Sequence, residues 1–311
     1  MNHTLTIKNS HAPLTWHIID KPTKKQIVWI KDNFDFDEQD LNDCLPPNQR
    51  PKLNVQSNYL FMILMFPYYD HTTQEIKSSE IDFFITRNEI VLVHNNHLQP
   101  ILDLQQECQT TENARKEFMA NDSRLLYEIL NRLLHYCFPM LNHINQDVDN
   151  IETKILEIKK NKLDVIREIM RIKKNIVNFR KIMQAHKSII TKLIKNSETI
   201  FPVSHLNIYL EHLVSHTKDI WEFLENYKET INALHETHES LLSHRLNEII
   251  KTLTIFSVIV FPLTLMAAIF GMNTMNSMPF VNSAYDFWFV TAIMLVGAIG
   301  MLFYFKKKRW L

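Results

Sequence analysis

Two apolar stretches decide the fold, and the first of them reads TLTIFSVIVFPLTLMAAIF from Thr252 to Phe270. The second runs from Phe287 to Phe305, and each stretch contains 19 residues without a charged side chain. At a rise of 1.5 Å per residue, each would form a helix about 28 Å long, close to the ~30 Å hydrocarbon thickness of a bilayer. The 16 residues between them carry one charge, that of Asp286. The sequence therefore predicts transmembrane helices at 252–270 and 287–305.

Basic residues flank the two spans on one side only. Lys251 precedes the first span, whereas the connecting loop, 271–286, contains neither Lys nor Arg. The basic tail, 306–311, follows the second span and contains Lys306, Lys307, Lys308 and Arg309. Because positive residues stay on the cytoplasmic side, we expect a multi-pass protein of the cell (inner) membrane, with both termini cytoplasmic and the loop outside.

Composition excludes several classes of function. The net charge of the 311 residues is zero, which does not favour a nucleic-acid partner. Glycine is absent from the first 270 residues, so that part lacks the glycine-rich loops that cradle phosphates. The three cysteines are widely spaced: Cys44, Cys108 and Cys137. Because no nucleophile, base and orienting group occur together, we do not expect an enzyme, and no cofactor is indicated.

The soluble part begins with an α/β pattern over residues 1–110. Two helices are expected, at about Thr23–Asn33 and Glu38–Cys44. Strand-like runs occur at Leu14–Ile19, Tyr59–Phe66, Ile81–Thr86 and Glu89–His94. The last two runs flank a plausible tight turn, so they predict a hairpin.

Beyond residue 110 the pattern is helical throughout. We expect a helical hairpin region over 111–202, with breaks near Lys159–Lys162 and Asn196–Pro202, and a stalk helix over 203–251. The stalk continues into the first span without a breaker, so that Asn207–Phe270 would be one helix about 95 Å long. A helix of that length needs neighbours, which a parallel bundle of copies would supply. The fold class is an α+β domain followed by long helices and two C-terminal spans.

The helical region carries two segregated charge patterns. Residues 159–195 contain 12 Lys or Arg and two acidic residues. One face of the stalk carries Glu222, Glu225, Glu229 and Glu236, with Asn247 close to the same face. The acidic row could line a central cavity and concentrate cations, could pair with the basic hairpin, or could simply be solvated. The basic hairpin could dock on anionic lipid or an acidic neighbour, or could also be solvated.

The first span ends in Phe270-Gly271-Met272-Asn273. A Gly-Met-Asn triplet at this place, a long preceding helix and the closing Lys306–Leu311 sequence resemble the CorA family of magnesium channels. Arg50-Pro51-Lys52 and Pro262-Leu263-Thr264 also look like segments of that family. The resemblance implies a funnel-shaped homopentamer in the bilayer, with Mg²⁺ as the transported ion and the long helix and first span lining the pore.

The resemblance also implies where ions would pass. The triplet Gly271, Met272 and Asn273 would form the selectivity filter. The pore-lining positions would be Asn247, Ile250, Leu253, Ser257, Phe261 and Thr264, most of them spaced by three, four or seven residues. Mg²⁺ sheds its water reluctantly, so five Asn273 carbonyls could accept hydrogen bonds from the waters of a hydrated ion. Two simpler interpretations are a C-terminal helix cap for Asn273 and a backbone-bonded helix residue for Thr264.

Three features depart from the family pattern. The outer loop reads Met278-Pro279-Phe280 where the family often has Met-Pro-Glu. The stalk segment Tyr209–His216 lacks the aspartates of the family's regulatory magnesium site. His212 and His216 stand there instead, at a spacing that could hold a softer regulatory metal, although surface or subunit-contact histidines are the simpler interpretation.

These observations favour a channel that imports Mg²⁺, with Co²⁺ or Ni²⁺ as further cargo. A Zn²⁺ transporter of the same superfamily is an alternative. A membrane-anchored sensor or scaffold that conducts nothing is another, and the missing acidic residues keep it open.

Overall fold

A computed structural model describes residues 2–8, 13–156, 162–196, 205–272, 285–308 and 310. The chain forms two compact units, Met1–His235 and Glu236–Leu311. The first unit is a six-stranded sheet with helices on both faces, and the second contains two helices among its described residues. The predicted fold class, an α+β domain followed by long helices and two apolar C-terminal helices, is confirmed.

The sheet is mixed and runs in the order β1-β2-β6-β5-β4-β3. Its strands are β1 (Asn2–Lys8), β2 (Pro13–Asp20), β3 (Lys52–Val55), β4 (Leu60–Asp70), β5 (Glu75–Ile85) and β6 (Glu89–His94). Neighbouring strands are antiparallel except β2 and β6, which pair in parallel. The predicted hairpin is present: β5 and β6 meet at a tight turn in which the Thr86 N–H donates to the Glu89 carbonyl at 2.9 Å.

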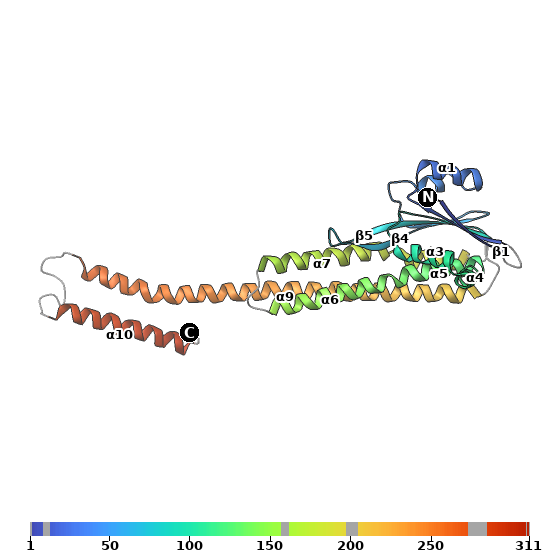
Figure 1. Ribbon diagram of the computed structural model, residues 1–311. Helices are drawn as coiled ribbons and strands as arrows, with labels where there is room; N and C mark the ends of the chain where they lie inside the picture. The colour runs from blue at the N-terminus through green and yellow to red at the C-terminus, as the bar shows by residue number, and fades with distance from the viewer. Residues whose placement is uncertain are drawn as a thin grey trace. The chain divides into compact units, whose positions relative to one another are not determined.

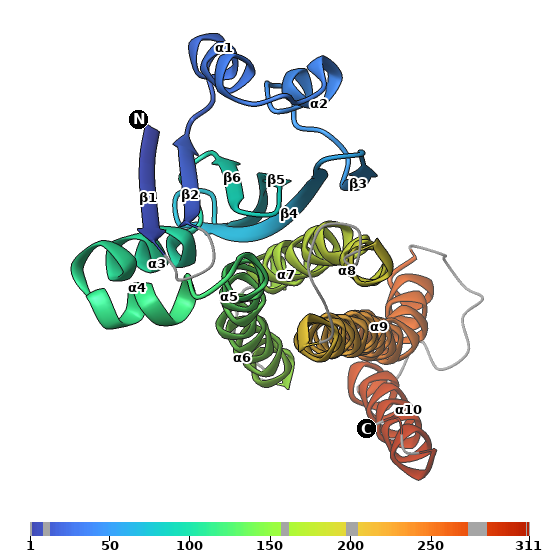
Figure 2. The same cartoon turned by 90° about the vertical axis from the view of Figure 1, so that its right-hand side faces the viewer.

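Two short helices, α1 (Lys24–Asn33) and α2 (Glu38–Asp43), lie on one face of the sheet (Figure 2). Both begin where the sequence offers a cap. The Thr23 N–H donates to the Gln26 side-chain oxygen at 2.9 Å, and Asp37 accepts from the Gln39 N–H at 2.7 Å. Beneath them lies an apolar cluster of Ile19, Ile27, Ile30, Leu41, Cys44, Tyr59, Phe61, Ile63, Phe84, Val91 and Val93.

Helices from the second half of the first unit lie on the opposite face of the sheet (Figure 2). They are α3 (Gln99–Thr110), α4 (Glu112–Phe118), α5 (Asp122–His135), α6 (Cys137–Leu156), α7 (Lys162–Met183) and α8 (His186–Asn196). Helix α7 packs against β4 and β5, and its Asn175 side chain accepts from the Ile76 N–H at 2.9 Å and donates to the Gln74 carbonyl at 3.0 Å. The breaks expected near 159–162 and 196–202 fall mostly outside the described residues.

Helix α9 runs without interruption from His205 to Phe270, which confirms the predicted continuous stalk and span. In the first unit it buries a row of side chains spaced by three, four and seven residues: Leu210, Leu213, Thr217, Ile220, Leu224 and Ile231. This spacing places the row on one helix face, so the opposite face of the same stretch remains exposed.

The second unit contains the rest of α9 and α10 (Asp286–Lys307). Helix α10 lies alongside the C-terminal part of α9 (Figure 1). Both helices are long and apolar enough to cross a membrane, and their most apolar stretches are almost entirely exposed in the single chain. A soluble core helix of this composition would be buried, so the exposure supports the prediction of two transmembrane helices.

Candidate ion pathway

Helix α9 presents two different sides in the second unit. One side carries Ile255, which is 7% exposed, with Ile259 and Leu263 half-buried at successive steps of four residues. On α10, Phe305 is also 7% exposed, and its ring stacks on Trp310. Because α10 lies alongside this part of α9, we infer that the less exposed side of α9 faces it (Figure 1).

The predicted lining positions lie on roughly the opposite side of α9, because each residue turns the helix by about 100°. Ile250, Leu253 and Phe261 are 51%, 63% and 71% exposed. Asn247 and Thr264 are exposed as well, and Ser257 is half-buried. The structure therefore brings these positions together on the face of α9 that α10 leaves uncovered.

The Thr264 hydroxyl donates a hydrogen bond to the Val260 carbonyl at 2.9 Å. Thr254, one turn from Ser257, donates to the Ile250 carbonyl in the same way at 2.8 Å. Each bond uses the only proton of the hydroxyl, so the oxygen lone pairs remain as acceptors. Since waters bound to a divalent cation act as donors, back-bonding leaves the hydroxyl suited to a hydrated ion.

At its C-terminal end, α9 closes with Gly271, whose N–H donates to the Ala267 carbonyl at 2.9 Å. A Cβ atom at this position would stand 3.0 Å from that same oxygen, so a larger residue would have to shift the backbone. Met272 follows and is 59% exposed. Asn273, Met278, Pro279 and Phe280 lie outside the described residues.

The acidic row on α9 is divided between two environments. In the first unit, the Glu225 carboxylate pairs with Arg180 of α7 and with Lys228 at 2.6 Å. The hydrogen bond from Lys228 lowers the pKa of Glu225, and the charge of Arg180 adds to the effect. Glu222 lies 3.5 Å from Lys218 and is exposed, and Glu229 and, in the second unit, Glu236 are also exposed.

His212 and His216 belong to a group of rings between α5 and α9. The His216 ring centroid is 4.9 Å from that of His135 and 6.4 Å from that of His212, and Phe138 packs nearby. Partial burial lowers the pKa of His216, and a charge on His135 would lower it further. Within the part of the chain that the structure describes, no three His, Cys, Asp or Glu side chains are grouped to hold a metal ion.

Helix α10 ends in exposed basic residues. Lys306 and Lys307 occupy its last turn and Lys308 its C-cap, where positive charge complements the helix dipole. The Trp310 ring stacks on that of Phe305 with centroids 5.8 Å apart. The backbone N–H of Trp310 donates to the Phe305 carbonyl. Arg309 lies outside the described residues.

A polar site inside the first unit was not predicted from the sequence. Glu80 and Asp82 are buried on β5, although that strand is otherwise strongly apolar from Ile81 to Ile85. Two acidic residues spaced by two within such a run were the available signal, because that spacing places both on one face of a strand. The carboxyl groups line a small cavity beneath the segment that follows α2.

A soluble domain joined by one continuous helix to two apolar C-terminal helices defines a two-span membrane protein. The family model described as CorA-like Mg²⁺ transporter protein matches residues 12–307, so the chain belongs to this family of divalent-cation transporters. It is therefore a transport protein rather than an enzyme, and the predicted family is confirmed.

Individual relatives agree with this assignment. The cobalt/magnesium transport protein CorA of Thermotoga maritima is 27% identical over 309 residues, covering 99% of this chain and 86% of the relative. A putative metal ion transporter of Bacillus subtilis is 23% identical over 96% of this chain and 90% of its own length. The complete structure of the CorA magnesium transporter from Methanocaldococcus jannaschii superposes with a TM-score of 0.86 at 21% identity, covering 98% and 94% of the two chains.

Proposed function

We propose that this chain is one subunit of a homopentameric channel that imports hydrated Mg²⁺ across the cell (inner) membrane, with Co²⁺ and Ni²⁺ as further cargo. The observation that carries the proposal is the two-sided character of α9. One side carries the nearly buried Ile255, and the opposite, exposed side bears the predicted lining positions, which include Ile250, Phe261 and Thr264.

An oligomer follows from simple geometry. Two helices in one chain cannot enclose a water-filled path, so several copies of α9 must surround it. The exposed side of α9 combines polar Asn247 and Thr264 with the apolar side chains of Ile250, Leu253 and Phe261. When copies face a common axis, the polar positions would offer resting places for hydrated cations. The apolar positions would form a constriction that gates by dewetting.

Ion selection in this proposal rests on neutral acceptors. A ring of Asn273 carbonyls at the outer end and a ring of Thr264 hydroxyls deeper in the span would accept hydrogen bonds from the ion's own water shell. Carboxylates at these places would bind Mg²⁺ directly and slow its release. With both termini in the cytoplasm, an inside-negative potential of 100 mV would drive two charges inward by about 4.6 kcal/mol.

The acidic row and the histidines have accessory roles in the proposal. Glu222, Glu229 and Glu236 would raise the local cation concentration at the cytoplasmic mouth, since they are exposed on α9. Glu225 would instead brace α9 against α7 through Arg180. His212 and His216 would need a ligand from another copy to hold a regulatory metal, because a lone pair of imidazoles binds metal weakly.

Flux into liposomes tests the proposal. Purified protein is reconstituted with an internal Mg²⁺ dye, and uptake is compared for wild type, Asn273→Ala and Thr264→Val. We expect Asn273→Ala to abolish uptake and Thr264→Val to lower it about tenfold, as loss of one hydrogen-bonding ring predicts. No uptake of Mg²⁺, Co²⁺, Ni²⁺ or Zn²⁺ by an intact wild-type oligomer would leave a sensor or scaffold as the better explanation.

The chain supplies a matched control. Thr291 on α10 donates its hydroxyl to the Phe287 carbonyl at 2.7 Å, the same geometry as Thr264 on α9. Thr291→Val therefore removes the same atom from the helix that is not proposed to line the path. Equal losses of flux in Thr264→Val and Thr291→Val would reject the assignment of Thr264 to the pore.

A further inference from the structure

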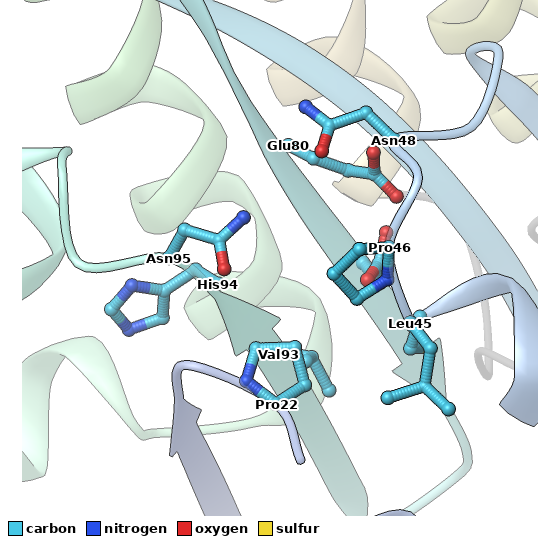
Figure 3. Close-up of a pocket in the computed structure, with 10 residues that line it drawn as sticks. Pro22, Leu45, Pro46, Asn48, Glu80, Val93, His94 and Asn95 are labelled. Carbon is cyan, nitrogen blue, oxygen red and sulfur yellow. The ribbon is translucent and has the colours of Figure 1, made fainter. Parts of the chain in front are cut away.

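A small cavity lies between β5, β6 and the segment Cys44–Gln49, which follows α2 (Figure 3). Pro46 and Asn48 of the covering segment and Glu80 of β5 are among the side chains that surround it. The cavity has room for about one water molecule. It is therefore too small for an organic ligand.

Two carboxyl groups enter this cavity from one strand. Glu80 and Asp82 are 6% and 3% exposed and point to the same face of β5 as Phe84, which belongs to the apolar cluster beneath α1 and α2. Asp82 lies between Ile63 of β4 and Val93 of β6 in the strand register. Its Oδ1 atom accepts no hydrogen bond from the described residues. A hydrogen bond with the Cys44 side chain favours a charge on Asp82, but the cost of burying that charge is larger.

The surrounding charged groups add no further stabilisation of the charged forms. Asp43 ends α2, and its negative charge opposes ionisation of both carboxyls. His94, at the end of β6, pairs through Nε2 with Asp20 of β2 at 3.1 Å, and burial lowers its pKa to about 4, so it is neutral near pH 7. The Lys52 ammonium on β3 is bonded to Asp43.

Burial and mutual repulsion then keep a proton in the pair. Burial raises the pKa of Glu80 from its usual value near 4.5 to about 7. Burial, followed by the charge of Glu80, raises the pKa of Asp82 well above the usual range. At neutral pH Asp82 holds its proton while Glu80 is close to half-ionised.

We propose that Glu80 and Asp82 form a proton-binding site that holds the segment Cys44–Gln49 closed over the sheet, and that this segment opens as the site loses its proton. The link is direct, because the Gln49 backbone N–H donates to Glu80 Oε2 at 2.8 Å. Once ionised, Glu80 keeps this bond and a hydrogen bond with the Asp82 side chain, both of which favour its charged form. Burial outweighs them, because it denies the carboxylate the hydration that it obtains in water. Lifting the covering segment restores that hydration.

The pH dependence of opening has a definite sign and size. Below pH 4.5 Glu80 is protonated in both the closed and the open form, so pH has no effect. Between about pH 4.5 and 7 the open form releases a proton that the closed form retains, so opening grows as pH rises. The pKa difference of Glu80 alone predicts an increase of about fortyfold from pH 5 to pH 7, and release of the Asp82 proton on opening adds to it.

Cys44 reports the opening. It is 4% exposed and lines the cavity, so a thiol reagent reaches it only when the covering segment lifts. Cys108, buried on α3 away from this site, is an internal reference in the same molecule. Full-length protein in detergent is labelled at pH 5, 7 and 9, and each cysteine is quantified by peptide mass. Dividing the Cys44 rate by the Cys108 rate removes the intrinsic pH dependence of thiol reactivity.

The wild-type ratio should rise at least fortyfold from pH 5 to 7, because Asp82 also gains hydration on opening and adds to the rise. Glu80→Gln should remove the part of the rise that Glu80 contributes, and Glu80→Gln combined with Asp82→Asn should give a ratio independent of pH. A flat wild-type ratio, or an equal rise in the double variant, would overturn the proposal. If the variants fail to assemble, the wild-type profile still decides, because a ratio that does not rise between pH 5 and 7 is incompatible with a site that releases a proton on opening.

Discussion

Asn175 offers a sharp test of how α7 is attached to the sheet. Its side chain is 4% exposed, accepts from the Ile76 N–H at 2.9 Å and donates to the Gln74 carbonyl at 3.0 Å. The Asn175 amide thus accepts one hydrogen bond and donates one, as a backbone peptide group of a neighbouring strand would. The two bonds join segments about 100 residues apart in the sequence. Asn178, one turn later on α7, makes a single bond to the Ile76 carbonyl at 3.2 Å and is half-buried.

Replacing Asn175 by alanine leaves two backbone groups without this partner, the Ile76 N–H of β5 and the Gln74 carbonyl just before it. The Ile76 N–H is buried, and a buried donor without a bond costs about 1–3 kcal/mol. Loss of the second bond adds about 1 kcal/mol, so we expect a destabilisation of about 2–4 kcal/mol. Asn178→Ala removes one bond at a partly solvated place, and about 1 kcal/mol is expected there.

Hydrogen exchange of the β5 peptide in the full-length protein measures the effect locally. At 1.4 kcal/mol per factor of ten, Asn175→Ala should speed exchange of the Ile76 amide by about 30- to 1,000-fold, compared with about fivefold for Asn178→Ala. The thermal midpoint should fall by about 5–15 °C in Asn175→Ala. Exchange in Asn175→Ala no faster than in Asn178→Ala would refute the reasoning, since it would mean that the two bonds carry no more stability than one.

Two further predictions concern acid stability and helix contacts. His186 is fully buried against Phe66, and burial lowers its pKa from 6.5 to about 4. Between those pH values the unfolded chain binds a proton that the folded chain does not, so the wild type loses stability as the pH falls from 7 to 4. In His186→Leu this loss should be smaller by up to about 3 kcal/mol, measured by acid unfolding. A Cβ atom added at Gly297 or Gly300 would meet no atom of the described residues within 4 Å, so alanine should fit within one subunit. Weaker assembly of Gly300→Ala in native mass spectrometry would then report a neighbouring copy at that glycine, and unchanged assembly would exclude close packing there.

The central strands were predictable because their side chains are strongly apolar and their turn is short. The predicted run Glu89–His94 coincides with β6. The predicted run Tyr59–Phe66 begins one residue before β4. The edge strands β1 and β3 were not recognised. Lys52–Val55 is only four residues long and half of its residues are polar, since an edge strand has fewer neighbours to pack against. Pairing of β2 with β6 in parallel joins residues more than 70 positions apart, which local patterns do not encode.

For the candidate pathway, the lining role of these positions stays a prediction, and only their place on one helix face can be compared with the structure. Spacing by three, four and seven residues placed the lining positions on one face, and the structure exposes that face. The same spacing grouped Glu225 with Glu222 and Glu229, yet Arg180 of α7 pairs with Glu225. A helix face defined by such spacing is wide, so two residues on it can meet different neighbours. Which neighbour each meets depends on tertiary contacts that the sequence of one helix does not contain.

Large apolar side chains are buried in the first unit but exposed in the second, and this difference indicates different roles for the two units. In the first unit, side chains such as Phe61 and Phe84 are completely buried by one chain, so its core needs no second copy. In the second unit, Phe261 and Leu265 remain more than 60% exposed. Lipid can cover such apolar surface, whereas Asn247, before the span, and the acceptor lone pairs of Thr264 suit water or other polar groups. Substitutions on this face should therefore alter assembly and flux while the first unit keeps its own stability, and that separation is the physical expectation for a pathway built between copies.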